Sequence, residues 1–165
     1  MLDQPLLHHT FVIERRYSQA PARVFKAFAD PAKKRRWMGG DSDVKHATRE
    51  AHGQTFVIDS FTCEFRVEGV ERWRFHANGV PMTNDTFYLD IVPDRRIIFA
   101  YTMTRADVRF SSSHVTVELV PDGAGTRLVF TEQGVHFDGK TDSAAGREEG
   151  TRGLLEALAT ELERA

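Results

Sequence analysis

Apolar and polar residues alternate through much of the chain, as they do in β-strands that have one buried face. Residues 61–67 show this alternation, and residues 72–76 repeat it after Gly69, so the two runs predict a hairpin. Further runs of strand-forming residues lie at 11–17, 87–92, 97–103, 114–120 and 126–131. The pattern therefore predicts seven strands.

Two turn sequences join the later strands into hairpins. Pro93 and Asp94 separate the fourth and fifth predicted strands, and the proline ring and the aspartate carboxylate both favour a turn. The sequence PDGAG at 121–125 separates the last two strands and is a stronger turn signal. Neighbouring strands are therefore expected to pair antiparallel.

Helical spacing replaces the alternation after the first strand. Pro21 opens a run with apolar residues at helical spacing, and Pro31 opens a short basic segment that ends near Trp37, before Gly39 and Gly40. Proline is tolerated in the first turn of a helix, and glycine breaks a helix. Two short helices are therefore predicted after the first strand.

The C-terminal segment from about Ser143 carries a leucine stripe, and Asp142 or Ser143 is placed to cap its start. The stripe consists of Leu154, Leu155, Leu158 and Leu162. Such a helix must bury its stripe, and the sheet is the only partner that the pattern provides. The order strand, two short helices, six strands and long helix predicts an α+β fold.

The length of the chain predicts one domain, because 165 residues are the size of a single ordinary domain. We expect this domain to span residues 1–165, with a flexible N-terminus at about residues 1–9. Residues 41–54 are polar and weakly patterned, which predicts a loop or an irregular insertion.

Composition narrows the range of partners. The chain has 22 Lys and Arg against 24 Asp and Glu, so no overall field attracts nucleic acid or an anionic membrane surface. It has one cysteine, no signal-peptide pattern at residues 1–10, and no apolar run of about 20 residues that would span a bilayer. These features predict a cytoplasmic protein that binds neither nucleic acid nor a membrane.

Short segments throughout the chain resemble the activator of heat-shock-protein-90 ATPase homologue family, within the START-like superfamily. This superfamily, also called SRPBCC, includes birch-pollen-allergen-like and polyketide cyclase/dehydratase proteins. The matching segments are FVIER (11–15), APARVF (20–25), DP (30–31), RW (36–37), RWRF (72–75), YLDIVPD (88–94), GTRL (125–128), TEQG (131–134) and REEGTRGL (147–154). The resemblance implies a helix-grip fold, in which a curved seven-stranded antiparallel sheet wraps around a long C-terminal helix.

Members with this fold include lipid carriers, aromatase/cyclases, hormone receptors and co-chaperone modules, so the resemblance alone fixes no activity. The chaperone activator pairs this domain with a separate N-terminal domain, for which 165 residues leave no room. Stimulation of a chaperone ATPase is therefore not the leading expectation.

Aromatic residues are the first candidates for the wall of a ligand cavity. Trp37 ends the second short helix, and in the resembling families the aromatic at this place borders the cavity mouth; helix-to-sheet packing is the alternative. Strand residues expected to face inward, as cavity wall or as plain core, are Trp73, Phe75, Phe87, Phe99, Tyr101 and Phe130.

Glu132 is the most informative polar candidate, because it continues the inward face of the last strand, where a carboxylate needs a partner. Arg147 and Thr151 share the helix stripe with the leucines and are expected to face the same space. A polar cluster there would orient a ligand. In the alternative interpretation Glu132 lies past the strand end and pairs structurally with Arg15 or Arg147.

Other polar residues point to no further chemistry. The seven histidines, at 8, 9, 46, 52, 76, 114 and 136, show no metal-ligand spacing and are expected to be solvated at strand edges. The basic run at 33–36 spreads around a helix and is expected to be solvated. Cys63, with Phe61 and Phe65 on the same face, is expected to be an inert core thiol.

The leading functional hypothesis is non-covalent binding of a small hydrophobic or aromatic molecule between the sheet and the C-terminal helix, in a cavity of at least roughly 300 Å³. It involves no cofactor, no metal and no catalytic residue. One alternative is a cyclase, dehydratase or hydrolase acting in that cavity, with Glu132 or a nearby Tyr or His as acid or base. Another alternative is a protein-interaction module for a chaperone, which a filled interior with an exposed apolar patch would favour. The sequence also allows the protein to form a homodimer.

Overall fold

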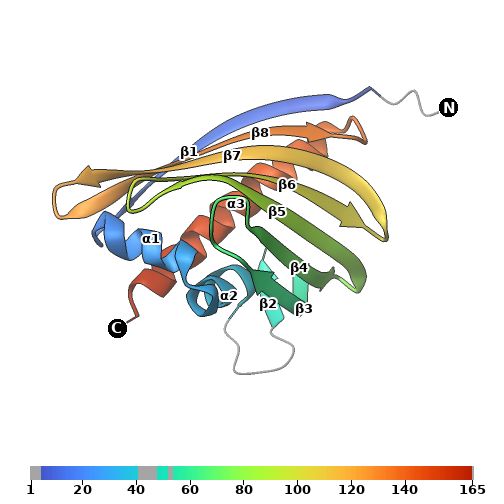
Figure 1. Cartoon of the computed structure of the whole chain (residues 1–165). Helices are drawn as coiled ribbons and strands as arrows, with labels where there is room; N and C mark the ends of the chain where they lie inside the picture. The colour runs from blue at the N-terminus through green and yellow to red at the C-terminus, as the bar shows by residue number, and fades with distance from the viewer. Residues whose placement is uncertain (1–4, 41–47, 52–53, 165) are drawn as a thin grey trace.

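The computed structural model describes residues 5–40, 48–51 and 54–164. Within them, eight strands form one antiparallel sheet in the order β1-β8-β7-β6-β5-β4-β3-β2, and three helices complete the fold (Figure 1). The strands are β1 (Leu7–Tyr17), β2 (Thr48–Ala51), β3 (Gln54–Cys63), β4 (Val70–Ala77), β5 (Val80–Val92), β6 (Arg96–Arg105), β7 (Val108–Asp122) and β8 (Gly125–His136). The helices are α1 (Pro21–Ala29), α2 (Pro31–Gly39) and α3 (Thr141–Leu162).

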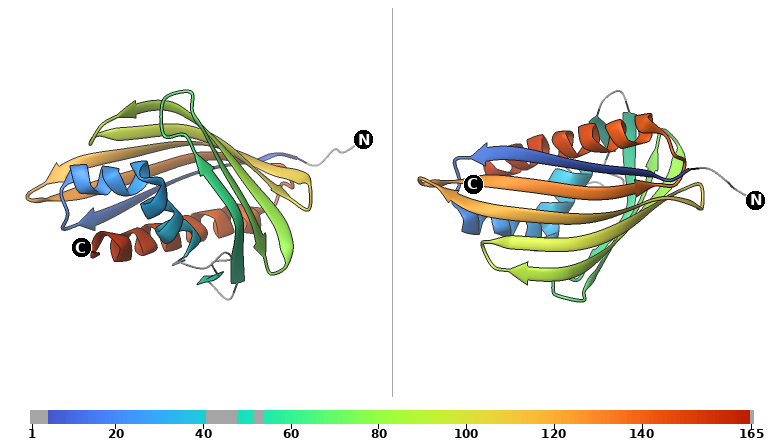
Figure 2. Two further views of the ribbon diagram at one scale, coloured as in Figure 1. Left: turned by 60° about the horizontal axis from the view of Figure 1, so that its bottom comes forward. Right: turned by 90° about the horizontal axis from the view of Figure 1, so that it is seen from above.

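The sheet is curved, and α3 lies along its concave side (Figure 2). Register shifts between Ile58 and Ser60, between Tyr88 and Asp90, and between Ser111 and Arg109, opposite Met103 and Thr104, mark β-bulges in β3, β5 and β7. A bulge bends its strand and increases the local twist, so these irregularities help the sheet to wrap around one helix. The α+β helix-grip fold expected from the sequence is present.

The leucine stripe of α3 forms the centre of the core. Leu155, Leu158 and Leu162 are fully buried in one cluster with sheet residues such as Val117 and Leu128. Burying each leucine contributes roughly 1.5–3 kcal/mol before entropy is counted. Although α3 is the longest helix, no helix in the described part of the chain is long and apolar enough to cross a membrane.

The helix starts follow the sequence in two cases and differ in one. Pro21 and Pro31 stand in the first turns of α1 and α2, and the Asp30 carboxylate caps α2. α3 begins after Lys140, which provides no side-chain cap, so the expected cap from Asp142 or Ser143 is wrong. Instead, Asp138, which precedes the helix, accepts hydrogen bonds from the Lys140 backbone N–H and from the Ser143 hydroxyl in the first turn.

The first predicted hairpin lies earlier in the chain than its alternation suggested. β3 ends at Cys63, and residues 64–69 form a tight loop in which a Cβ on Gly69 would lie 2.0 Å from the Glu64 carbonyl oxygen. Phe65 packs edge-on against Tyr88 at 5.1 Å between ring centroids. Its apolar character therefore reflects packing from a loop, which alternation does not distinguish from a strand.

Two ends of the sheet also differ from the sequence prediction. The segment 41–54, expected to be a loop, contains the short edge strand β2 and the first residue of β3, while residues 41–47 and 52–53 lie outside the described residues. β1 begins at Leu7, so residues 7–9 pair with β8 rather than belonging to a flexible tail. Short polar strands such as β2 carry almost no alternation signal of their own.

Candidate functional site

Two adjacent chambers lie between α3 and the concave face of the sheet, with volumes of about 350 Å³ and about 90 Å³. The larger one exceeds the size expected from the sequence, roughly 300 Å³, which is the lower end for small-molecule sites. The residues that line both chambers, and so mark where they meet, are Met38, Asn84, Tyr101, Thr151 and Leu154. Leu158, expected at the cavity, lies deeper in the closed core.

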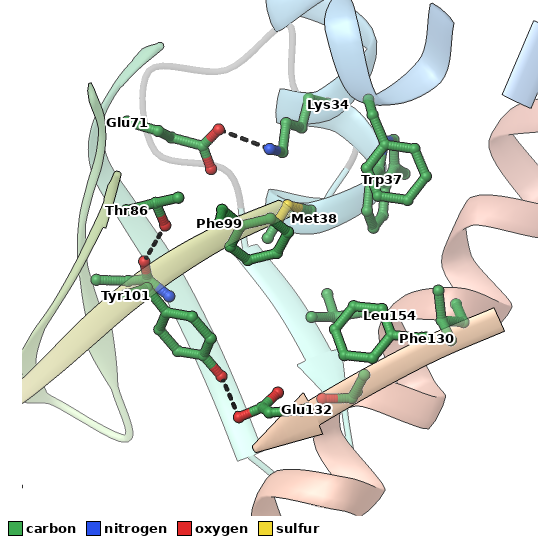
Figure 3. A pocket seen from close by; sticks show the side chains of 14 residues that line it. Lys34, Trp37, Met38, Glu71, Thr86, Phe99, Tyr101, Phe130, Glu132 and Leu154 are labelled. Atoms are coloured by element: carbon green, nitrogen blue, oxygen red, sulfur yellow. Dashed lines mark hydrogen bonds and ion pairs between the residues drawn. The ribbon is translucent and has the colours of Figure 1, made fainter. Parts of the chain in front are cut away.

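The chambers bring together nine of the ten predicted site residues. Trp37, Phe99, Phe130 and Glu132 line the smaller chamber, Trp73, Phe75 and Arg147 line the larger one, and Tyr101 and Thr151 line both. In Figure 3 the apolar side chains of Phe99, Met38 and Leu154 lie between two polar groups, Lys34 with Glu71 at one end and Tyr101 with Glu132 at the other.

Phe87 does not belong to the site, so its prediction as a lining residue is wrong. Its side chain is 44% exposed on the outer face of β5, whereas Thr86 and Tyr88 on either side of it are buried. Leu89 follows Phe87 on the outer face, so this strand has large side chains on both faces. Alternation alone did not reveal which face is buried.

Two glycines of α3 leave the larger chamber open. Gly146 and Gly150 are one helical turn apart, and both line this chamber. A Cβ atom added at either position would meet nothing within 4 Å. Glycine inside a helix is destabilising by roughly 0.5–1 kcal/mol relative to alanine, so α3 is less stable with glycine at these two positions than it would be with alanine. Two glycines four residues apart in the predicted helix could have indicated open space beside it. The leucine stripe alone predicted only the buried face.

Glu132 lies at the centre of a buried polar cluster. It is 1% exposed in β8, and its Oε1 accepts hydrogen bonds from the Tyr101 hydroxyl at 2.7 Å and from Arg147 Nη1 at 3.1 Å. Arg147 also donates to the hydroxyls of Ser111 at 2.7 Å and Ser113 at 3.2 Å. The expected pairing of Glu132 with Arg147 is present, and Glu132 lies within the strand rather than beyond its end. Arg15 instead pairs with Glu156 on the surface.

The cluster is a fixed network at neutral pH. Burial raises the pKa of the Tyr101 hydroxyl and outweighs the charge of Arg147, which lowers it, while the charge of Glu132 acts in the same direction as burial, so Tyr101 remains a protonated donor. Burial alone would lower the pKa of Arg147, but Tyr101 and Glu132 outweigh burial and raise that pKa. Glu132 Oε2 has no hydrogen-bond partner among the described residues although it is buried. One carboxylate oxygen of Glu132, Oε1, therefore accepts two hydrogen bonds, and the other, Oε2, accepts none from the described residues.

A second buried ion pair, which the sequence pattern did not indicate, borders the other end of the smaller chamber. Lys34 Nζ donates to Glu71 Oε2 at 2.6 Å and to the Tyr88 hydroxyl at 2.8 Å. Burial alone would raise the pKa of Glu71, but the charge and hydrogen bond of Lys34, with hydrogen bonds from Tyr88 and Trp73, lower it. Lys34 is 5% exposed, so the expectation of a fully solvated basic run at 33–36 is wrong. The partner on β4 is distant in sequence and compensates the desolvation of the lysine.

Trp37 serves both of the roles considered for it. Its indole Nε1 donates to the Ala27 carbonyl at 2.9 Å, and its ring packs edge-on against Phe28 at 5.2 Å. The same side chain lines the smaller chamber. α2 therefore places Trp37 as a packed wall between the helices and the cavity.

The remaining candidates have structural explanations. The Cys63 thiol lies 3.3 Å from Glu71 Oε2, and burial followed by the Glu71 charge raises its pKa to about 11, as fits an inert thiol. His114 is exposed, but His136 is 2% exposed, so its expected solvation is wrong: it faces inward on β8 with the parity of Glu132. His46 and His52 lie outside the described residues, and among those described no three His, Cys, Asp or Glu side chains could hold a metal ion.

An antiparallel sheet that wraps around a C-terminal helix and encloses chambers against it defines a START-like, helix-grip protein. The family model of the Activator of Hsp90 ATPase homolog 1-like protein matches residues 19–163, and the chain belongs to this family. The resemblance read from the sequence motifs is thereby confirmed.

Solved structures extend this relationship over nearly the whole chain. The Mll3558 protein from Rhizobium loti is 49% identical, with a TM-score of 0.81, over 95% of this chain and 99% of that one. An uncharacterised protein from Rhizobium leguminosarum is 36% identical, with a TM-score of 0.83, over 98% of each chain. The CV1439 protein from Chromobacterium violaceum, 24% identical with a TM-score of 0.71, shows the shared fold alone. No curated protein matches the chain.

Proposed function

We propose that this protein binds a small, mostly apolar or aromatic molecule, non-covalently, in the two chambers between α3 and the sheet. The observation that carries the proposal is the larger chamber, a half-open pocket of about 350 Å³ beside a closely packed core. Small-molecule sites are concave, mostly apolar pockets of roughly 300–1,000 Å³, and the larger chamber falls within this range.

The walls of the chamber match an apolar ring system. Trp73 and Phe75 from β4 and Met103 from β6 supply aromatic and thioether surfaces, while Gly146 and Gly150 leave room along α3. Trp73 is held in place because its Nε1 donates to Glu71 Oε1 at 2.7 Å, so the wall is formed before a ligand arrives. A preformed wall reduces the entropy lost on binding.

Binding is better supported than turnover in this site. Acid or base catalysis needs a group that exchanges a proton near the working pH. Tyr101 has a raised pKa, and its hydroxyl is already engaged with Glu132 and Arg147. These hydrogen bonds favour a role in orienting a ligand over a role in proton transfer.

Binding is also better supported than a role as a protein-interaction module. Such a module was expected to combine a filled interior with an exposed apolar patch. Phe87 and Leu89 are 44% and 42% exposed on the outer face, but the interior holds the chambers described above. The pocket between α3 and the sheet therefore favours a small-molecule ligand.

The experiment is a titration of naphthalene, an apolar ring probe, into the wild-type protein and two variants. Gly150→Phe directs a ring from α3 into the chamber, and Ala145→Phe places the same ring at an exposed position of the same helix. We expect saturable binding to the wild type and the Ala145→Phe control, and binding to Gly150→Phe that is weaker by at least about tenfold, or ~1.4 kcal/mol. Absence of binding to the wild type, or equal affinity for Gly150→Phe, would contradict the proposal.

A further inference from the structure

We infer that the ligand carries a neutral hydroxyl group at one end, which enters the smaller chamber and donates a hydrogen bond to Glu132 Oε2, while the apolar body occupies the larger chamber. The inference rests on the proposed function and specifies the chemical class of its ligand. It begins from the one carboxylate oxygen of the polar cluster that the described residues leave without a partner.

Glu132 Oε2 is a hydrogen-bond acceptor that the fold does not satisfy. Tyr101 and Arg147 both donate to Oε1, Glu132 lines the smaller chamber, and in Figure 3 its second oxygen points away from the Tyr101 hydroxyl. A buried acceptor without a partner is destabilising, especially when it belongs to a charged group. A donor on a bound molecule removes this penalty, so the site has a specific preference for one.

The other carboxylate of the chamber does not compete for that donor. Glu71 Oε1 accepts from Trp73, and its Oε2 accepts from Lys34 and Tyr88 and contacts the Cys63 thiol. Both oxygens are therefore engaged. A ligand with one polar end is expected to point that end toward Glu132 rather than toward Glu71.

The charge balance of the cluster selects a neutral donor. Arg147 already compensates the charge of Glu132 within a buried ion pair. An ammonium ligand would bring an additional desolvated charge, and a carboxylate ligand would place its lone pairs against Oε2. A hydroxyl supplies the proton that Oε2 requires and adds no charge.

The two volumes fix the orientation of the molecule. The smaller chamber, about 90 Å³, admits a small polar group with its adjoining atoms, whereas the larger chamber accommodates a ring system. Tyr101, Thr151 and Leu154 line both chambers, so the chambers are adjacent, and a ligand that occupies both would contact these three residues. The hydroxyl and the body of the ligand are thereby assigned to different chambers.

The test compares three probes of similar size on the wild-type protein at pH 7: 2-naphthol, 2-methylnaphthalene and 2-naphthoate. A hydrogen bond to a charged acceptor predicts that 2-naphthol binds at least about tenfold more tightly than 2-methylnaphthalene, or ~1.4 kcal/mol. The anionic 2-naphthoate is expected to bind weakest. Equal binding of 2-naphthol and 2-methylnaphthalene would overturn this inference and leave the proposed function intact, whereas no binding of any probe would overturn both. Tightest binding of 2-naphthoate would show that Arg147 is the recognition group and would also overturn the inference.

A variant locates the preference on the carboxylate. In Glu132→Gln the amide oxygen takes over the hydrogen bonds of Tyr101 and Arg147, and the amide NH₂ faces the chamber. The preference for 2-naphthol over 2-methylnaphthalene is expected to fall to within about twofold, a free-energy difference below ~0.5 kcal/mol. A preference that persists unchanged would place the donor contact elsewhere. If this variant does not fold at the assay temperature, the comparison of the three probes on the wild type still decides.

Discussion

Glu132 and Lys34 are both buried charges, and the sequence pattern indicates the first more directly than the second. Glu132 continues the inward parity of β8, and its partner Arg147 lies on the face of α3 that the leucine stripe defines. Lys34 lies in a basic run that looks solvated, and its partner Glu71 is 37 residues away. Glu71 lies two residues before the inward-facing Trp73 on β4, so alternation places its carboxylate on the inner face as well. A buried carboxylate needs a cationic partner.

Replacing Glu132 by Gln should destabilise the protein clearly. The substitution leaves Arg147, which is mostly buried, without its counter-ion, and removing one partner of a buried pair costs about 3 kcal/mol. Urea unfolding measures the change in the free energy of unfolding. The matched control is Glu14→Gln, which removes a carboxylate from an exposed pair with Arg127 and should cost about 0–1 kcal/mol. Equal small losses in both variants would show that the Glu132 pair is solvated.

His136 should make the stability of the protein depend on pH near neutrality. Burial, followed by the charge of Arg147, lowers the pKa of His136 below its usual value, while Asp138 and Glu132 act in the opposite direction and His9 lowers it. Protonation then favours the unfolded state, so the contribution of neutral His136 is complete above about pH 6.5 and is lost as the pH falls toward the lowered pKa.

The measurement is the free energy of unfolding between pH 7.5 and 5.5 for His136→Gln and for His114→Gln, whose histidine is exposed. We expect a decline toward low pH in the wild type and in His114→Gln, and a flatter profile in His136→Gln. A wild-type decline that survives in His136→Gln would assign the titration to another group. Glu71, with its lowered pKa, contributes only at more acidic pH.

At the scale of elements, α3 combines two tasks that its sequence pattern mixes together. Its leucines close the core on one side, and its glycines open the larger chamber on an adjacent side. The strands show a similar mixture. Periodicity predicted the hairpins of β5 with β6 and of β7 with β8, but it misplaced β3 because Phe65 packs from a loop, and it missed β2 because that strand is short and polar.

Replacing Gly150 by Ala should stabilise the fold. Alanine is favoured over glycine inside a helix by roughly 0.5–1 kcal/mol, and the added Cβ meets nothing within 4 Å. Thermal unfolding should therefore show a higher melting temperature. Gly69→Ala serves as the opposite case, because its Cβ would lie 2.0 Å from a backbone oxygen, and it should destabilise the protein. A destabilised Gly150→Ala variant would contradict the open space assigned to this position.

At the scale of the whole molecule, the curved sheet, α2 and α3 enclose a volume that the core residues leave unfilled. The fold followed from the sequence, and nine of the ten residues predicted to line the site do so, because inward parity on strands and helix stripes is set by burial. The size of the chambers did not follow, since it depends on how far α3 lies from the sheet and on which side chains are too short to fill the gap. Asn84 and Met38 illustrate this: both line the two chambers, and neither belongs to a pattern that singles it out.

The most direct test of the central claim is a crystal structure of the protein in complex with 2-naphthol. We expect the ring to lie in the larger chamber beside Gly150 and Trp73, with the hydroxyl oxygen about 2.5–3.0 Å from Glu132 Oε2. A ring bound on the outer face beside Phe87, or chambers that stay empty at saturating 2-naphthol, would contradict this claim.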